Sequence, residues 1–401
     1  VNQYAFHNIG DSMLGMSVAL QLKVSMKNSK ANTTNIPNNE IKLFLAIELG
    51  KKQWKLCFSE GDKIRHRTVD GRDAKAVINE IELCKNKFGM PAETSVWSCY
   101  EAGRDGFWLH RYLEQNNIHN KVFDSSSIEV NRRAKRTKTD KVDAEKLVRL
   151  LMRMMLWGES KVCAVVRVPT NEQEAQMRTG RERERLIKER GAHIVRIRSL
   201  LHLKGIEVGR VHIIDFRKLR DPMNEPLSEE LIIELEREQD RMKLVEEQVK
   251  KVEAVQKQSI SDDQQLSEES AKVVKLMTLK GIGPQTSWVL VYEFFWRKFK
   301  NRKQVGACAG LTGCPYDSGA TRQEQGISKA GSRRVRTCCV EMAWIWVRFQ
   351  PHSKLTQWFK ERCGAKPTSR TKRICIVALA RKLLIALWKY IEQDQLPEGA
   401  I

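Results

Sequence analysis

The sequence predicts an α/β domain with a mixed sheet, then a coiled-coil helical arm and a mainly α-helical C-terminal domain. Three adjoining β patterns followed by alternating helix and strand patterns predict the α/β domain at residues 41–160. Heptad-like apolar spacing predicts the arm at residues 161–270, and helical patterns around a glycine hairpin predict the last domain at residues 271–401. Residues 1–40 include an Asn-, Thr- and Ser-rich stretch and are expected to be a disordered leader.

The charge of the 401-residue chain favours a nucleic acid as partner. It has 71 Lys and Arg against 49 Asp and Glu, a formal net charge of +22, and such a surplus attracts polyanions. A membrane role is disfavoured because the sequence has no long uncharged apolar span. None of the ten cysteines forms a CxxC pair. Neither a zinc ribbon nor a disulfide framework is therefore indicated, and a reducing cytoplasm is the expected location.

In the first domain, apolar runs and the turn residues between them define the expected elements. The expected strands are Lys42–Leu49, Trp54–Ser59, Ile64–Val69, Thr94–Tyr100 and Lys121–Asp124. The expected helices are Arg72–Lys87, Phe107–Asn116 and Asp140–Trp157.

Four acids of this domain form the first candidate site. Glu48 and Glu101 stand at strand ends, and Asp140 and Asp143 share one face at the start of a helix. Ligand sites in such sheets gather at the C-terminal ends of strands, and converging carboxylates need a cation such as Mg²⁺ or Mn²⁺. The alternative is that these acids bind no metal. Asp140 and Asp143 would then be acids favoured at a helix N-terminus by the macrodipole, and Glu48 and Glu101 would be solvated acids where strands end.

A basic run leads directly into Asp140. Its cations are Arg132, Arg133, Lys135, Arg136, Lys138 and Lys141. Such a run is usually a solvated face or linker, but beside a carboxylate cluster it is interpreted as a clamp on the phosphate backbone.

The arm is predicted from two helices. Residues 171–205 are expected to form a long basic helix, with a bend near Gly180 or Gly191. A heptad-like seam then follows at Leu235, Met242, Val245, Val249 and Val252. The two helices could form a dimerising coiled coil or a helical hairpin within one chain.

The last domain holds a second candidate site between Gly310 and Arg336. Ser318 precedes Gly319 on an expected turn, and clustered cations surround it: Arg322, Lys329, Arg333, Arg334 and Arg336. A hydroxyl beside such cations suits attack on a phosphodiester, and the glycines permit a positive φ and close approach to a ligand. The alternative is a Gly- and Ser-rich surface loop with solvated arginines.

Two further features of this domain suggest contact with nucleic acid. Gly281 and Gly283 resemble the turn of a helix-hairpin-helix element, which presents backbone N–H groups to phosphate; the alternative is a helix–helix turn with Pro284 at the first helical position. Trp296–Arg373 contains 18 Lys and Arg against 4 Asp and Glu. Aromatic residues among these cations could stack on bases or belong to the core: Trp344, Trp346, Phe349, Trp358 and Phe359.

With these motifs the sequence resembles a DEDD transposase of the insertion-sequence one-ten family, most closely its eleven-eleven subgroup. The similarity covers essentially everything after residue 40, and its most specific block is AGLTGCPYDSG…GISKAGSRRVR. It implies a RuvC-like (RNase H-like) first domain in which Glu48, Glu101, Asp140 and Asp143 hold the metal. It also implies that Ser318 is the nucleophile. The family usually has Asp where this chain has Glu48.

The resemblance also implies a chemistry and partners. Ser318 would form a covalent phosphoserine–DNA intermediate with donor and target DNA, guided by a structured bridge RNA, in a dimer or a tetramer on DNA in the bacterial nucleoid. An alternative enzyme is a RuvC-like Holliday-junction endonuclease that uses metal-activated water. A third reading is a catalytically decayed nucleic-acid-binding protein, suggested by Glu48.

Overall fold

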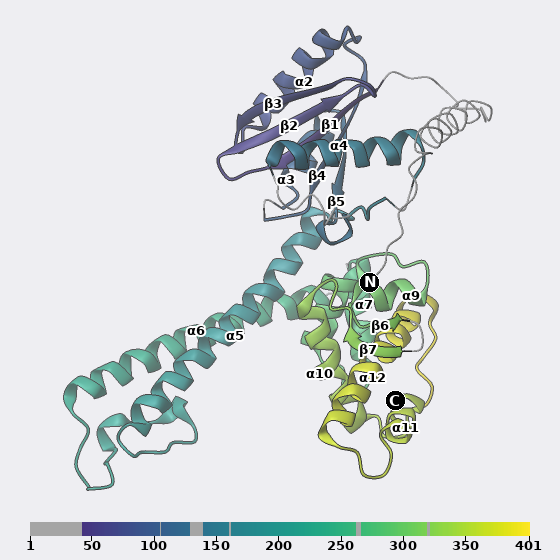
Figure 1. The fold of residues 1–401 in the computed structure, drawn as a ribbon. Helices are drawn as coiled ribbons and strands as arrows, with labels where there is room; N and C mark the ends of the chain where they lie inside the picture. Colours follow the sequence, from purple (N-terminus) through teal and green to yellow (C-terminus); the bar gives the residue numbers. More distant parts are fainter. Residues whose placement is uncertain (1–41, 105, 129–138, 160–161, 262–265, 319–320) are drawn as a thin grey trace, which may run out of the picture. The chain divides into compact units, whose positions relative to one another are not determined.

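The chain divides into two compact units, residues 1–168 and 169–401 (Figure 1). The computed structural model describes residues 42–104, 106–128, 139–159, 162–261, 266–318 and 321–401. The expected leader and the basic run from Arg132 to Lys138 lie outside the described residues. Of Ser318 and Arg322 the backbone alone is described.

The first unit contains a five-stranded sheet in the order β3-β2-β1-β4-β5. The strands are β1 (Lys42–Leu49), β2 (Gln53–Ser59), β3 (Ile64–Asp70), β4 (Ser95–Glu101) and β5 (Ile118–Phe123). β1, β2 and β3 pair antiparallel, whereas β4 runs parallel to both β1 and β5. The predicted mixed α/β sheet is confirmed.

Helices cover both faces of this sheet. They are α2 (Ala74–Phe88), α3 (Trp108–Gln115) and α4 (Asp140–Leu156); the 3₁₀ turn η1 (Ser125–Ser127) follows β5. Because side chains alternate along a strand, β1 contributes Leu43, Leu45 and Ile47 to the core under α2 and α3. Phe44 and Ala46 instead pack under α4, which lies across β1, β2 and β4 (Figure 1).

The second unit begins with two long helices that pack on each other, α5 (Asn171–His202) and α6 (Glu229–Ser261) (Figure 1). The 3₁₀ turns η3 (Val211–Ile213) and η4 (Phe216–Lys218) lie between them in the sequence. The expected seam faces inward: Val245 and Val249 are buried against Leu186 of α5. The pairing within one chain is therefore the helical hairpin, and dimerisation through the arm stays a prediction.

The rest of this unit is mainly helical, as predicted. Its helices are α7 (Glu268–Met277), α8 (Pro284–Leu290), the π-helical turn η5 (Val291–Phe295), α9 (Arg302–Cys308), α10 (Arg333–Phe349), α11 (Lys354–Cys363) and α12 (Ser369–Gln393). Their core includes Trp288, Trp346 and Leu383. The arm belongs to the same compact unit, so the expected boundary at residue 270 stays a prediction. In the described part of the chain, no helix is long and apolar enough to span a bilayer.

Candidate functional site

Glu48 and Glu101 occupy neighbouring positions at one end of the sheet. In the parallel pair β1 and β4, Ile47 lies opposite Tyr100, so the next residues, Glu48 and Glu101, follow in register. They share the face of Ala46, which packs under α4. Glu48 is half-buried and Glu101 is exposed. The structure thus brings two of the predicted acids together at the C-terminal ends of parallel strands.

The first turn of α4 carries the other two acids. Thr139 caps the helix by accepting a hydrogen bond from Val142 N, which fixes where the helix begins. Asp140 is exposed and Asp143 is half-buried, with Lys146 Nζ 4.0 Å from Asp143 Oδ1. Ala144 follows directly and is buried against the sheet. Both acids therefore precede the part of α4 that packs on the same face as Glu48 and Glu101.

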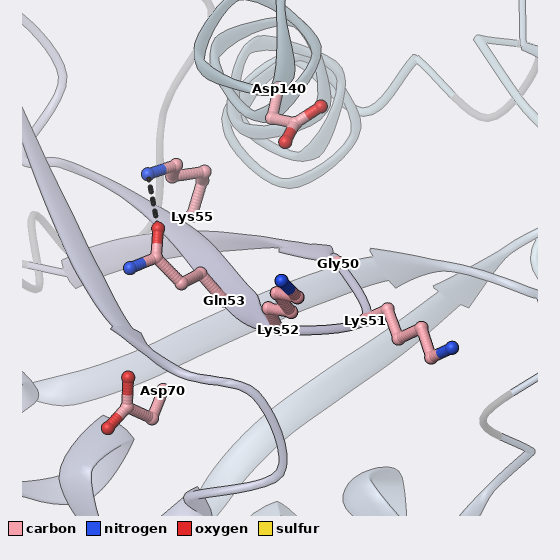
Figure 2. Close-up of a pocket in the computed structure, with 7 residues that line it drawn as sticks. All are labelled: Gly50, Lys51, Lys52, Gln53, Lys55, Asp70 and Asp140. Atoms are coloured by element: carbon pink, nitrogen blue, oxygen red, sulfur yellow. Dashed lines mark hydrogen bonds between the residues drawn. The ribbon is translucent and has the colours of Figure 1, made fainter.

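Asp140 also lines a pocket of about 400 Å³ beside the turn that follows β1. Figure 2 shows Asp140 on α4 facing the β1–β2 turn, which supplies most of the lining. The full lining is Gly50, Lys51, Lys52, Gln53, Lys55, Asp70 and Asp140. The pocket therefore includes one candidate acid, Asp140, and lies beside the end of the strand that carries Glu48, two residues before Gly50.

Oxygen donors suit Mg²⁺ or Mn²⁺, and in this respect the four acids fit the expected metal. Among the residues that the structure describes, no group of three or more His, Cys, Asp or Glu side chains is close enough to hold an ion. The backbone brings Glu48 beside Glu101, but the four carboxylates would have to turn toward one another to share a cation. Metal binding by these acids stays a prediction.

Several titratable groups near α4 have shifted pKa values, and Glu145, His66 and Cys57 are among them. A hydrogen bond from Arg149 holds the pKa of Glu145 below its usual value, so this carboxylate stays ionised at neutral pH. Burial lowers the pKa of His66, and Lys141 lowers it further. Burial raises the pKa of Cys57 to about 12, which keeps this thiol protonated at neutral pH and makes it a poor metal ligand.

Ser318 ends a strand rather than lying in an open loop. β6 (Gly313–Ser318) and β7 (Thr321–Ile327) form an antiparallel hairpin in which Ser318 pairs with Thr321. Residues 319 and 320, which connect the two strands, lie outside the described part. The sequence predicts the turn at this serine but not the strands that flank it.

The base of this hairpin is held by close contact between two backbones. A Cβ on Gly310 would lie 2.0 Å from Ala330 O, and one on Gly331 would lie 2.1 Å from Cys308 O. Both glycines have a positive φ, of 67° and 72°. Lys329 N also donates to Gly310 O at 3.1 Å. These glycines therefore permit close packing within the chain itself, whereas the sequence suggests close approach to a ligand.

The three arginines that follow the hairpin lie in different surroundings. Arg333 is exposed, whereas Arg336 Nη1 donates to Ala330 O at 2.7 Å and to Gly331 O at 3.0 Å. Arg334 Nη1 lies 2.9 Å from Glu293 Oε1, and its Nη2 donates to Gly180 O at 2.5 Å. In this structure Arg334 and Arg336 contact the protein itself. Their contact with nucleic acid stays a prediction.

Glu293 joins the arm to the start of α10. It lies on η5, its side chain is 8% exposed, and it accepts from both Arg334 and Arg181 of α5. Gly180 lets α5 approach, because a Cβ there would lie 3.1 Å from Trp288. The expected bend is not needed to explain this glycine, since α5 continues without interruption through it.

We expect Glu293→Gln to lower the free energy of unfolding by about 2–3 kcal/mol, because it removes the charge that pairs two arginines at a buried position. Urea unfolding followed by circular dichroism measures this loss. The control is Glu253→Gln, since Glu253 pairs with Arg183 at 2.7 Å but is 40% exposed. That change should lower the free energy of unfolding by less than about 1 kcal/mol. Equal losses of stability in the two variants would contradict the stabilising role of the buried Glu293 pairs.

The glycine hairpin and the aromatic residues of the second unit are only partly exposed. Gly281 has a φ of 93° and packs on α10, where a Cβ would lie 3.2 Å from Phe349 Cβ. Gly283 caps α8 in open surroundings.

The aromatic residues differ in exposure: Trp346 is buried in the core, whereas Trp344 is 43% exposed and Phe349 is 40% exposed. Trp358 is half-buried under Lys382 Nζ, 4.6 Å from its ring centre, and Phe359 is buried. Only part of the predicted stacking set is therefore available to a ligand.

Sequence reasoning did not single out the lysines of the β1–β2 turn. Lys51 and Lys52 follow Gly50, just beyond the strand that carries Glu48, and Lys55 lies opposite Glu48 on β2. Their position, as two adjacent lysines beyond the C-terminal end of a strand that carries a candidate acid, could have identified them as candidate binding residues. Glu293 gave no such signal, because one of its partners lies 112 residues away in the sequence.

Comparison with known proteins shows the family of the chain. Residues 274–357 match the model described as "Transposase IS116/IS110/IS902 family". The chain is 38% identical over 375 residues to "Putative transposase y4rJ" of Sinorhizobium fredii (strain NBRC 101917 / NGR234), covering 90% of this chain and 94% of that protein. It is 26% identical over 257 residues to "Transposase for insertion sequence element IS1328" of Yersinia enterocolitica, covering 63% and 72%. The chain therefore belongs to the IS116/IS110/IS902 family of transposases.

Proposed function

We propose that this transposase cleaves and rejoins DNA through Ser318, with Mg²⁺ or Mn²⁺ held by Glu48, Glu101, Asp140 and Asp143. The observation that carries the proposal is the register of β1 and β4, which makes Glu48 and Glu101 neighbours on the face covered by α4. The first turn of α4 adds Asp140 and Asp143. Carboxylates from separate elements beside a basic turn suit a cation and a phosphodiester better than they suit a structural role.

The proposed reaction conserves the phosphoester bond. Ser318 Oγ attacks the phosphorus of a DNA phosphodiester, the Oγ–P bond forms, and the bond from phosphorus to one sugar oxygen breaks. The serine proton passes to solvent and the leaving sugar oxygen takes up a proton. A hydroxyl of another strand then attacks the same phosphorus and releases the serine. When bound, the metal supplies positive charge that activates the hydroxyl and stabilises the pentavalent transition state.

Ser318 and the four acids belong to different units of the chain. We propose that the acids of one protomer act with the serine of another, and that a structured bridge RNA guides the choice of DNA. The local charge supports an RNA partner, since Trp296–Arg373 carries a surplus of 14 positive charges. Guidance by RNA is tested by strand exchange on DNA that carries the ends of the insertion sequence encoding this transposase (the element). The assay is run with and without RNA transcribed from the DNA that flanks the gene. Full activity without RNA would contradict it.

Substitutions at Glu48 test whether the native site is active or has decayed. A glutamate side chain is longer than aspartate by one methylene, while Mg²⁺ demands near-octahedral geometry. We expect the native protein to exchange strands, Glu48→Asp to retain exchange, and Glu48→Gln to lose it, because only the last removes the charge. The measurement is the yield of exchanged strands in Mg²⁺. Turnover in Glu48→Asp alone would show instead that the native site has decayed.

A further inference from the structure

We propose that the pocket between the β1–β2 turn and the start of α4 binds a backbone phosphate of the DNA strand beside the four acids, through Lys51 and Lys52. This inference rests on the proposed function, since it places the phosphate next to the scissile one. It assigns a DNA contact to a turn whose residues have no role in the proposed chemistry.

The position of the pocket is the first argument. Asp140 forms one wall, and Gly50, Lys51 and Lys52 come within four residues of Glu48. A DNA strand whose phosphodiester lies among the acids must continue away from them on either side. The pocket includes Asp140 and, at about 400 Å³, is large enough for part of a sugar–phosphate backbone.

The charge of the pocket is the second argument. Lys51, Lys52 and Lys55 line it together with Asp70 and Asp140. Three cations outnumber the two acids, and Asp140 is itself one of the proposed metal ligands. Lys55 Nζ donates to Thr68 Oγ1 at 3.0 Å and lies 3.4 Å from Gln53 Oε1 (Figure 2). Lys51 and Lys52 are exposed on the turn, so their ammonium groups can reach a phosphate that enters from solvent.

The rigidity of the turn is the third argument. A Cβ on Gly50 would lie 2.3 Å from Gln53 O, so the turn is tight enough to require glycine. Gly71 N donates to Lys52 O at 2.8 Å, and a Cβ on Gly71 would lie 2.9 Å from Lys51 O. The backbone of both lysines is thus held against the segment after β3. A fixed backbone reduces the entropy lost when the lysines bind phosphate.

The lysine contact is tested by binding in the full-length chain. The variant is Lys51→Gln with Lys52→Gln, and the matched control is Lys63→Gln with Lys87→Gln, which removes two exposed lysines elsewhere on the same unit. The probe is a labelled DNA duplex carrying one end of the element, and affinity is measured in EDTA over a range of salt concentrations. We expect the pocket variant to bind about tenfold more weakly and the slope of log K against log salt to fall by about two.

Three outcomes decide the proposal. The proposal is supported if the pocket variant loses affinity for the duplex, the control retains it, and Lys51→Arg with Lys52→Arg restores it. Equal affinities in pocket variant and control would overturn it, as would a loss seen for a structured RNA probe but not for the duplex. Because binding in EDTA needs neither metal nor serine, absence of a covalent adduct in the native protein would defeat the proposed reaction without altering this result.

Discussion

Replacement of Ser318 by alanine is expected to abolish the covalent protein–DNA adduct and to lower strand exchange by about 10³-fold or more, since the variant lacks the attacking oxygen. The backbone of the site should persist, because Ser318 ends β6 through main-chain pairing with Thr321. The measurements are the yield of adduct that survives denaturation and the rate of strand exchange in Mg²⁺.

Ser328→Ala is the matched control for this change. Ser328 lies after β7 in the same block and is exposed, so its loss should leave adduct and exchange near the native level. A junction endonuclease that uses water predicts a different pattern, in which Ser318→Ala still cleaves DNA at a near-native rate. That result would contradict the serine mechanism while leaving the carboxylate site intact.

Asp140→Asn is expected to lower both adduct formation and cleavage by about 10³-fold or more, since it removes a charge proposed to hold the catalytic metal. Asparagine has nearly the same shape as aspartate, and Thr139 would still cap α4, so the fold should remain. The rates of adduct formation and cleavage as functions of Mg²⁺ concentration measure the effect.

Glu145→Gln provides the comparison on the same helix. It removes the same charge, but Glu145 is engaged by Arg149 through hydrogen bonds of 2.7 and 3.2 Å. We expect its rates to stay near the native ones. If the two variants lost activity equally, a general electrostatic effect of α4 would explain the result better than a metal ligand at Asp140.

The first domain was predictable because its local signals agree. The strand expected at Lys42–Leu49 has those bounds in the structure, and the helix expected at Asp140 begins there. A run of buried apolar residues marks the strand, and Thr139 followed by two acids marks the helix start. The neighbouring positions of Glu48 and Glu101 were expected from strand ends alone, but their register needed the structure.

The hairpin that carries Ser318 was not predictable in the same way. β6 contains Pro315, and β7 is polar along most of its length, so neither has the β-branched and aromatic content that predicts a strand. At the base of the hairpin Gly310 lies close to Ala330, 20 residues later in the sequence. Such contacts join residues that local patterns cannot relate.

The partners of Arg334 and of the α6 seam could not be predicted from the sequence, because they lie far away along the chain. The sequence gives Arg334 as a cation near Ser318, yet its guanidinium contacts Glu293 and Gly180, which precede it by 41 and 154 residues. The heptad seam of α6 indicated a helical partner without identifying it. The structure supplies α5 of the same chain as that partner.

Ser318 is proposed to become joined to DNA in a reaction that needs the four acids and their metal. Mass spectrometry of a protease digest, after reaction with the element's DNA, tests it directly. We predict a nucleotide attached to the peptide that contains Ser318 in Mg²⁺, and none in EDTA or in Asp140→Asn. Cleaved DNA with no modified peptide, or a nucleotide attached to another residue, would contradict the claim.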